Sequence, residues 1–414
     1  MSKNRQLLLI FSIVLIDVIA GSGLGVLISN YVLNLPAKPV LMTVGTALML
    51  GVQLAGSPAI GRWSDLRGRR PAAIATTVVS LLSSLFLLPV QTWGYVASRW
   101  VKGGSNGLYS VMRSAVADLT DKDELLKYGG LFSFIAGSAP VIGPMGAGWL
   151  MLVFHEARIN PLPTVLLLLA LGMLNIRLAL LFQETNPKKE AVDYTELADK
   201  ARNSLKVVSI WQQLLEADKQ LPGIKSILIL NLLATLGMGY FAFFVAFLTQ
   251  SKLIMTPAET ARFFLYYGGL ALAANFIFFT YIVQHVNKRI AILVMALISI
   301  VLQIVYTFSE SSVELFYVVA GVDALTVSII TGLTGGILSQ VIKEGSGQGE
   351  MFGNIQALGG LASFATALVN SLLSGVSLKA PFIFCAISMI AVVIWTIRLP
   401  EAARQHTDSK TPAT

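Results

Sequence analysis

The segment GRWSDLRGRRP, residues 61–71, separates two long apolar runs of the sequence, 38–60 and 72–90. Each run is long enough to cross the hydrocarbon core of a bilayer as a helix, which takes about 20 residues. Between the runs, Gly61 and Gly68 permit a tight turn, and the arginines outnumber the single acid. The segment therefore predicts a positively charged turn at a membrane surface, joining two spanning helices.

The composition of the whole chain supports the same interpretation. Of 414 residues, 55% are hydrophobic and 13% are charged, whereas soluble domains have about 25% charged residues. These values exclude a disordered chain, a coiled coil, a disulfide scaffold and an ordinary soluble enzyme. The net charge of +8 is interpreted as loops that face anionic lipid, because no nucleic-acid-binding signature interrupts the apolar runs. The predicted partner is therefore a lipid bilayer and not nucleic acid.

Twelve apolar runs along the chain are long enough to span a membrane. The predicted fold class is an all-α membrane protein with twelve transmembrane helices in two six-helix bundles. The predicted domains are an N-terminal bundle at 1–182, a linker at 183–224, a C-terminal bundle at 225–398 and a cytoplasmic tail at 399–414. The runs lie at 6–33, 38–60, 72–90, 92–118, 127–154, 162–182, 225–250, 259–282, 290–308, 312–342, 349–375 and 379–398.

The distribution of Lys and Arg predicts the orientation of these helices. With both termini placed in the cytoplasm, 21 of the 30 basic residues lie in cytoplasmic segments, 5 lie on the opposite side and 4 lie inside helices. This asymmetry follows the positive-inside rule and favours an even number of helices. No small-residue cleavage site follows the first run, which is therefore interpreted as a retained helix and not as a signal peptide.

The linker at 183–224 is predicted to contain an amphipathic helix. Apolar residues recur at helical spacing in its second part, at Val207, Val208, Trp211, Leu214 and Leu215. We interpret them as one face of a helix that lies on the membrane surface. A regulatory partner site is the alternative.

Asp17 and Asp323 are the two acidic residues, of 22, that lie deep inside apolar runs. Each lies about ten residues into its run, roughly 15 Å deep at about 1.5 Å per residue, near the middle of the hydrocarbon. Burial favours the neutral acid and a nearby cation favours the carboxylate, so such a group can load and release a proton. We predict proton coupling at both residues. The alternatives are a permanent ion pair of Asp17 with Arg99 or Lys102, and a hydrogen-bonded neutral acid.

Arg99 and Lys102 are cations inside the run at 92–118. Because intramembrane cations are costly, they usually face a polar cavity, and these two suggest a cargo with an anionic or zwitterionic group. A structural ion pair or snorkelling is the alternative. Polar residues in other runs are candidates for lining the cavity, with interhelical hydrogen bonding as their alternative role: Gln53, Asn106, Asn231, Asn275, Gln303, Asn354 and Gln356.

The segment at 61–71 resembles motif A of the major facilitator superfamily. The matching residues are Gly61, Asp65, Gly68, Arg69 and Arg70, whereas Leu66 stands where the family usually has a basic residue. The resemblance implies a conformational latch. In it, Asp65 lies near the amino end of the helix at 349–375, where the helix dipole favours an anion, and Asp118 pairs with Arg69. A plain positively charged loop is the alternative.

Two further motifs of the same superfamily have counterparts here. The segment SRWVKGGSNG, 98–107, is similar to motif B through Arg99 and Gly103. The segment GGLFSFIAGSAPVIGPMGAGW, 129–149, resembles motif C, which marks antiporters and therefore implies an efflux carrier; ordinary packing of small residues is the alternative. The residues expected to form this antiporter motif are Pro140, Gly143, Pro144 and Gly148, and Gly130 stands where the motif has its first glycine.

Two longer patches, LIDVIAGSGLGVLISN at 15–30 and QGEMFGNIQALGGLAS at 348–363, resemble the tetracycline/proton antiporters and related drug efflux carriers. The resemblance implies a multi-pass protein of the cell inner membrane in which two bundles rock around a central cavity. We expect it to export a drug or metabolite, to use the proton gradient without a cofactor, and to be a monomer.

Three alternatives to export remain open at this stage. A proton symporter or a facilitator for metabolite uptake would keep the fold and change the direction. A non-transporting membrane sensor or scaffold would not need the deep carboxylates. An enzyme is disfavoured, because the sequence has no zinc-ligand spacing, no phosphate-binding loop and no plausible catalytic triad.

Overall fold

The computed structural model describes residues 2–33, 38–137, 162–186, 194–204, 206–239, 252–253, 255, 257–343 and 348–408. Within these ranges the regular structure is helical throughout and no strand occurs. The chain forms two compact units, and each contains segments from both halves of the sequence. The first comprises Met1–Thr120, Ile142–Glu216 and Gly345–Leu361, and the second Asp121–Val141, Ala217–Glu344 and Ala362–Thr414.

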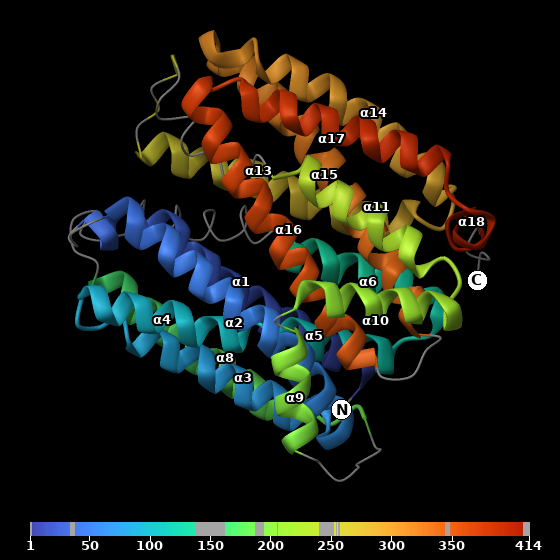
Figure 1. The fold of residues 1–414 in the computed structure, drawn as a ribbon. Coiled ribbons are helices and arrows are strands. Elements are labelled where there is room, and N and C mark those ends of the chain that lie inside the picture. Colours follow the sequence, from blue (N-terminus) through green and yellow to red (C-terminus); the bar gives the residue numbers. More distant parts are fainter. Residues whose placement is uncertain are drawn as a thin grey trace. The chain divides into compact units, whose positions relative to one another are not determined.

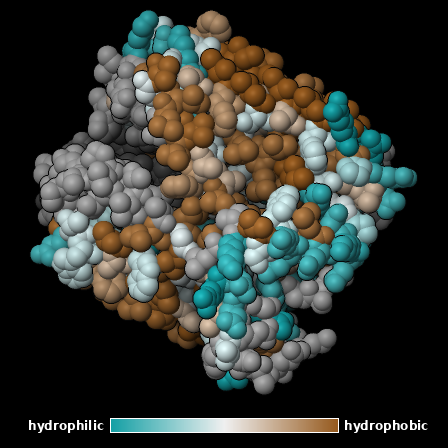
Figure 2. Space-filling view, in the orientation of Figure 1, coloured by the Kyte–Doolittle hydropathy of each residue, from teal (hydrophilic) through white to brown (hydrophobic). Residues whose placement is uncertain are grey.

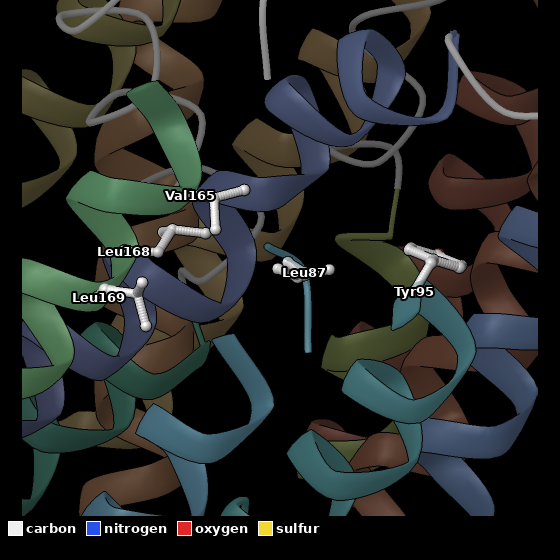
Figure 3. Close-up of a cluster of buried hydrophobic side chains, with 5 residues drawn as sticks. All are labelled: Leu87, Tyr95, Val165, Leu168 and Leu169. Carbon is white, nitrogen blue, oxygen red and sulfur yellow. The ribbon is translucent and has the colours of Figure 1, made fainter. Parts of the chain in front are cut away.

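The first unit is a group of helices packed side by side (Figure 1). Helix α2 packs on α3, α4 and α9, and α8 packs on α1 and α3. The unit contains a cluster of buried apolar side chains: Val165, Leu168 and Leu169 on α8, with Leu87 and Tyr95 (Figure 3). The helices are α1 (Lys3–Leu33), α2 (Lys38–Arg67), α3 (Arg69–Leu85), α4 (Thr92–Ser105), α5 (Leu108–Leu119), α8 (Leu162–Leu181), α9 (Tyr194–Ser204) and the start of α16 (Gln348–Val376).

The apolar run at 92–118 is not one continuous helix, contrary to the prediction. Helix α4 ends at Ser105 and α5 begins at Leu108, with a turn between them. The backbone N–H groups of Asn106 and Tyr109 bond three residues back, to Gly103 and Asn106, at 3.4 Å each. Three glycines within five residues, 103–107, lower the helix propensity at this point, and the tighter bonding follows.

The second unit is built around α15, which packs on α6, α11, α13 and α14. Every residue of α15 from 332 to 342 is buried, as expected of a helix that is surrounded by others. Figure 1 shows α14 and α17 lying side by side in this unit. Its helices are α6 (Lys122–Gly137), α11 (Ile224–Gly237), α13 (Pro257–Ile277), α14 (Lys288–Tyr306), α15 (Val313–Lys343), α17 (Ala380–Ile397) and α18 (Glu401–Asp408), with the remainder of α16.

Two short helices interrupt the pattern in the second unit. Helix α13 continues into a π-helix, η2 (Phe278–Ile282), and a 3-10 turn, η3 (Ser309–Ser311), separates α14 from α15. The N–H of Val283 bonds to the carbonyl of Phe278, five residues back, at 2.8 Å. The sequence predicted a single run over 259–282, and its length is right although its last turn is wider than an α-helix.

Six helices of the described residues are long and apolar enough to cross a membrane: Lys3–Gly21, Arg262–Ile282, Lys288–Tyr306, Val313–Lys343, Gln348–Val376 and Ala380–Ile397. Shorter apolar helices cover Val165–Leu181 and Ile224–Gly237. Figure 2 shows an apolar surface over α14 and α17, where Val301 and Ile387 are among the exposed side chains. The chain is therefore a multi-pass membrane protein, whereas the full count of twelve spans stays a prediction.

The linker contains α9 and a second helix, α10 (Val207–Gln220). The buried side of α10 agrees with the predicted face at Leu214, which is buried, and departs from it at Val208, which is 68% exposed; Ile210, outside the predicted face, is buried as well. At about 100° per residue, Val208 lies on the opposite side of the helix from Ile210. The division of the sequence into two bundles at this linker stays a prediction.

We expect Gly336→Ala to destabilise the second unit. A Cβ atom at this position would lie 2.8 Å from the backbone oxygen of Leu126 on α6. Overpacking of this kind typically costs about 1–3 kcal/mol, which outweighs the gain of about 1 kcal/mol in helix propensity. The thermal unfolding midpoint in detergent should therefore fall.

Gly269→Ala is the matched control for this substitution. A Cβ built at Gly269 would have no neighbouring atom within 4 Å among the described residues, apart from the nearby backbone of its own helix. Its midpoint should stay equal to wild type or rise. A Gly336→Ala midpoint that rises as much as that of the control would show that α6 and α15 are not in close contact.

Candidate functional site

Asp17 lies at the centre of a buried polar cluster in the first unit. Its Oδ1 accepts hydrogen bonds from Lys102 Nζ and from Ser80 Oγ, each at 2.8 Å. Its Oδ2 accepts one from the Tyr109 hydroxyl at 2.9 Å. Asp17 is 1% exposed and Lys102 is 4% exposed. Four different helices, α1, α3, α4 and α5, thus meet at one carboxylate.

The ion pair of Asp17 and Lys102 is the arrangement named above as the alternative to a free proton carrier. The sequence left open which cation pairs with Asp17, and the structure selects Lys102. The Arg99 guanidinium instead lies over the Tyr95 ring, 5.8 Å from its centroid. Space for Lys102 comes from Gly21, where a Cβ would approach its Cε to 3.0 Å. Lys102 is therefore neutralised within the protein, which weakens the inference of an anionic cargo.

Sequence reasoning missed Ser80 and Tyr109, which complete this cluster. Tyr109 lies seven residues after Lys102, a spacing that places both residues on one face of a continuous helix. That spacing was a usable signal. Ser80 belongs to a run with several serines, and nothing in the sequence distinguishes the one that meets Asp17.

The candidate cavity residues Gln53 and Asn106 contact each other. Asn106 Nδ2 donates to Gln53 Oε1 at 2.8 Å, and Gln53 Nε2 donates to the backbone carbonyl of Gln356 at 3.3 Å. The amide of Gln53 fits beside α16 because residue 360 is glycine, where a Cβ would lie 2.6 Å from Nε2. These bonds join α2, the turn between α4 and α5, and α16, which is the interhelical role named as their alternative.

Two further candidates also hydrogen-bond between helices. Asn354 Nδ2 donates to Gln213 Oε1 on the linker helix α10 at 3.0 Å. In the second unit, Asn231 Nδ2 donates to Thr334 Oγ1 at 3.1 Å. Their role in binding a substrate stays a prediction.

Asp323 is completely buried in the second unit, among aromatic side chains. Its Oδ2 accepts hydrogen bonds from the hydroxyls of Tyr267 at 3.0 Å and Tyr306 at 3.2 Å. The ring of Tyr306 stacks on that of Phe382, with centroids 4.9 Å apart. The sequence did not identify either tyrosine, because nothing in its pattern separates these rings from the lipid-facing and packing aromatics.

The contact predicted for Asp65 is present. Its Oδ1 accepts from the backbone N–H of Gly349 at 3.0 Å, and its Oδ2 accepts from that of Glu350 at 3.1 Å. These are orphan N–H groups at the start of α16, which carry the positive end of the helix dipole. The backbones approach closely here, since a Cβ at Gly61 would lie only 2.0 Å from the Gly349 oxygen.

Arg69 holds the two acids of this region together. It hydrogen-bonds to the Asp65 carboxylate, and its Nε lies 3.1 Å from Asp118 Oδ2, as the resemblance implied. The side chain is 3% exposed. Gly68, just before it, has φ of +112°, which a residue with a side chain would adopt only with strain. The geometry of a latch is present, while its action in transport stays a prediction.

Glu184 is a part of this region that sequence reasoning missed. Its carboxylate accepts hydrogen bonds from the backbone N–H groups of Arg69 at 2.7 Å and Arg70 at 3.1 Å, and so caps the start of α3. Thr185 Oγ1 donates to Asp118 Oδ2 at 3.1 Å, and Asn186 Nδ2 donates to the Asp65 carbonyl at 2.8 Å. The segment after α8 therefore fixes the same turn. The Arg70 side chain bonds to the Leu180 carbonyl at 3.0 Å.

The antiporter motif falls outside the described residues, since Pro140, Gly143, Pro144 and Gly148 lie in the range 138–161. Its first glycine, Gly130, is described, and a Cβ there would lie 2.4 Å from the Phe279 ring. Across the described ranges, no group of three or more His, Cys, Asp or Glu side chains is arranged to hold a metal ion.

These features define a class: a multi-pass membrane protein with ion-paired and hydrogen-bonded side chains buried among its apolar helices. Comparison with known proteins identifies the family. The sequence profile described as Major Facilitator Superfamily matches residues 10–310. The chain therefore belongs to this superfamily of membrane transporters, and it has the superfamily's all-helical fold.

The curated relatives include tetracycline resistance proteins. The class H protein of Pasteurella multocida is 28% identical over 194 residues, which cover 46% of this chain and 47% of the relative. The class C protein of Escherichia coli is 27% identical over 164 residues, covering 36% and 39%. The matched segments thus span less than half of each relative's length.

Solved structures agree on the fold. The human organic anion transporter MFSD10 (TETRAN) has a TM-score of 0.77 and 16% identity, covering 96% of this chain and 100% of that one. The fucose:proton symporter FucP of E. coli has a TM-score of 0.61 and 12% identity, covering 97% and 100%. At these identities the likeness supports the fold alone.

We expect Lys102→Met to be strongly destabilising. Removing one partner of a buried ion pair leaves an uncompensated charge and typically costs about 3–5 kcal/mol. The double variant Asp17→Asn/Lys102→Met should recover part of this loss, because it removes both charges. The thermal midpoint in detergent measures both effects. The double variant could instead lose as much stability as Asp17→Asn alone and Lys102→Met alone lose together. That result would contradict a direct pair.

We expect Glu184→Ala to lower stability by about 0.5–2 kcal/mol, because it removes the acceptor at the start of α3. Glu184→Gln should lose less, since an amide oxygen still accepts one of the two hydrogen bonds. Glu216→Ala, an exposed acid on α10, is the matched control. Equal midpoints for Glu184→Ala and the control would refute the cap.

Proposed function

We propose that this chain is a secondary-active transporter that exchanges protons for a small organic molecule, a drug or metabolite, which it exports. The observation that carries the proposal is the buried carboxylate of Asp17, held by Lys102, Ser80 and Tyr109. Ionisable groups at this depth are costly and usually functional. The similarity to tetracycline resistance proteins supports the assignment to a drug-exporting class.

Competition for the Asp17 carboxylate provides the coupling in this proposal. A proton and a cationic or hydrogen-bond-donating group of the substrate can both replace the Lys102 ammonium at Oδ1, but not together. Protonation from one side therefore releases the substrate, and loss of the proton to the other side restores its site. Mutually exclusive binding at one group is what exchange requires.

The same pair also specifies when the alternative function would apply. An anionic substrate would compete with Asp17 for Lys102, freeing the carboxylate to take up a proton at the same time. Proton and substrate would then move together, as in a symporter. The charge of the transported group therefore decides the direction of coupling, whereas the fold, which a fucose:proton symporter shares, does not.

Asp323 is the second proton-coupling group in this proposal. Two tyrosine hydroxyls donate to its Oδ2, which stabilises the buried carboxylate. Protonation would weaken both hydrogen bonds and so loosen α13 and α14 around α15. Arg99, Gln53, Asn106, Asn231 and Asn354 are proposed to line the substrate path in the states where their interhelical bonds open.

The wider assignments belong to the same proposal. Twelve helices form two bundles in the cell inner membrane, with both termini in the cytoplasm, as the distribution of basic residues supports. The Asp65 contact with α16 then lies on the cytoplasmic side and acts as a latch between the halves of the sequence. The chain works as a monomer, without a cofactor, and the proton gradient supplies the energy.

The test is counterflow in proteoliposomes with an imposed pH gradient. Asp17→Asn should lose gradient-driven transport by at least tenfold, since an amide cannot exchange a proton, while counterflow without a gradient should fall less, because the amide oxygen still accepts a hydrogen bond from the substrate. Asp199→Asn, an exposed acid on α9, is the matched control and should behave as wild type. Full gradient-driven transport by Asp17→Asn would remove Asp17 from the mechanism.

The direction of coupling is read from the same vesicles. In the proposed exchange, protons leave the acidified compartment and substrate enters it. Acidifying one compartment should therefore make the substrate accumulate there. Accumulation in the direction of proton flow would identify the symporter. Absence of flux for wild type across cationic, anionic and neutral compounds would favour the sensor or scaffold.

A further inference from the structure

A small pocket in the second unit does not include the buried carboxylate of Asp323 in its lining. Its volume is about 180 Å³, and it is lined by Lys127, Tyr128 and Leu131 of α6, Phe276 of α13, and Phe279 and Thr280 of η2. Pockets for drug-sized ligands usually measure about 300–1,000 Å³. The pocket is therefore too small for an organic cargo of that size, and it holds only part of a larger ligand.

The walls of this pocket are polar at one end and apolar at the other. Lys127 supplies an ammonium group and Thr280 a hydroxyl, whereas Leu131, Phe276 and Phe279 are apolar. Lys127 lies 5.6 Å above the Tyr128 ring. The nearby acid on the same helix, Glu124, accepts a hydrogen bond from the backbone N–H of Asp121 at 3.3 Å, one turn earlier. The pocket thus combines a positive charge with hydrocarbon contact.

The pocket borders the lipid-facing side of its helices. Phe276 is 55% exposed, and its neighbours Ile277 and Tyr281 are exposed as well. In the sequence, Lys127 stands at the start of one apolar run and Thr280 near the end of another. Lys127 is near the amino end of its helix and Thr280 near the carboxyl end of its own. In the predicted topology these two ends lie on the same side of the bilayer, at the level of the lipid headgroups.

The π-helix shapes this pocket. Its wide turn places Phe279 between two helices: the ring lies where a Cβ at Gly130 of α6 or at Gly332 of α15 would come within 2.4 Å. Phe279 is buried, whereas Thr280, the next residue, is only partly so. π-helical turns are frequent at functional sites. A ligand in this pocket would contact α6, α13 and η2.

We propose that this pocket binds one anionic phospholipid of the surrounding bilayer. The phosphate lies beside Lys127 and Thr280, and an acyl chain runs over Leu131 and Phe276 along the exposed face. Basic pockets between transmembrane helices bind anionic headgroups in this way. The lipid is a structural ligand that holds α6 against η2, and the proposal does not depend on the transported substrate.

The experiment is native mass spectrometry of the purified full-length protein with phosphatidylglycerol, and with phosphatidylcholine of the same acyl chains. Wild type should retain one phosphatidylglycerol in preference to phosphatidylcholine. Lys127→Gln should weaken this binding about fivefold, the effect of one basic residue near a membrane surface. Lys127→Arg should retain it, and Thr280→Trp should abolish it by filling the pocket without changing the charge.

Lys225→Gln is the matched control, because Lys225 is an exposed lysine at the start of α11, outside the pocket. It should bind phosphatidylglycerol as wild type does. Phosphatidylglycerol should also raise the thermal midpoint of wild type more than that of Lys127→Gln.

Three results would overturn the proposal. Equal binding by Lys127→Gln and wild type would show that Lys127 takes no part. Equal retention of phosphatidylcholine would make the pocket an apolar contact without headgroup recognition. Displacement of the lipid by inorganic phosphate at comparable concentration would identify a soluble anion as the ligand.

Discussion

A charge in the middle of the hydrocarbon must be neutralised by the protein, because no water is available to solvate it. This constraint explains the buried polar cluster around Asp17 in the first unit. Asp17 and Lys102 cancel each other, and Ser80 and Tyr109 supply the remaining donors. Since the four residues come from four helices, the helices must meet at this depth, and any change in the ionisation of Asp17 acts on all of them.

A related constraint applies at the helix ends, whose first N–H groups have no partner inside the helix. Two carboxylates provide these partners from segments far away in the sequence. Asp65 binds the start of α16, and Glu184 binds the start of α3. Arg69 connects both arrangements, since its backbone N–H bonds to Glu184 and its side chain to Asp65. The motif is therefore a junction of three segments and not a simple turn.

The sequence predicted the all-helical fold class and the bounds of several described helices, because hydrocarbon thickness and helix rise leave little freedom in element length. Helix α15, for example, covers 313–343 where the sequence predicted 312–342. The exceptions are local. They are the break at Asn106, where glycines lower the helix propensity, and the wide turn of η2, and hydropathy registers neither. In the candidate site, Asp17, Lys102 and Asp65 could be identified, because an isolated charge in an apolar run or a spaced glycine–acid pattern is conspicuous.

By itself, the sequence determined that this chain spans a membrane and which charges must be compensated there, since both follow from the cost of placing polar groups in hydrocarbon. Only the tertiary structure decided which groups compensate them. The choice of Lys102 over Arg99 for Asp17, and of Tyr267 and Tyr306 for Asp323, depends on which helices pack together. Helix packing is set by the summed contacts of many side chains, which no single motif records.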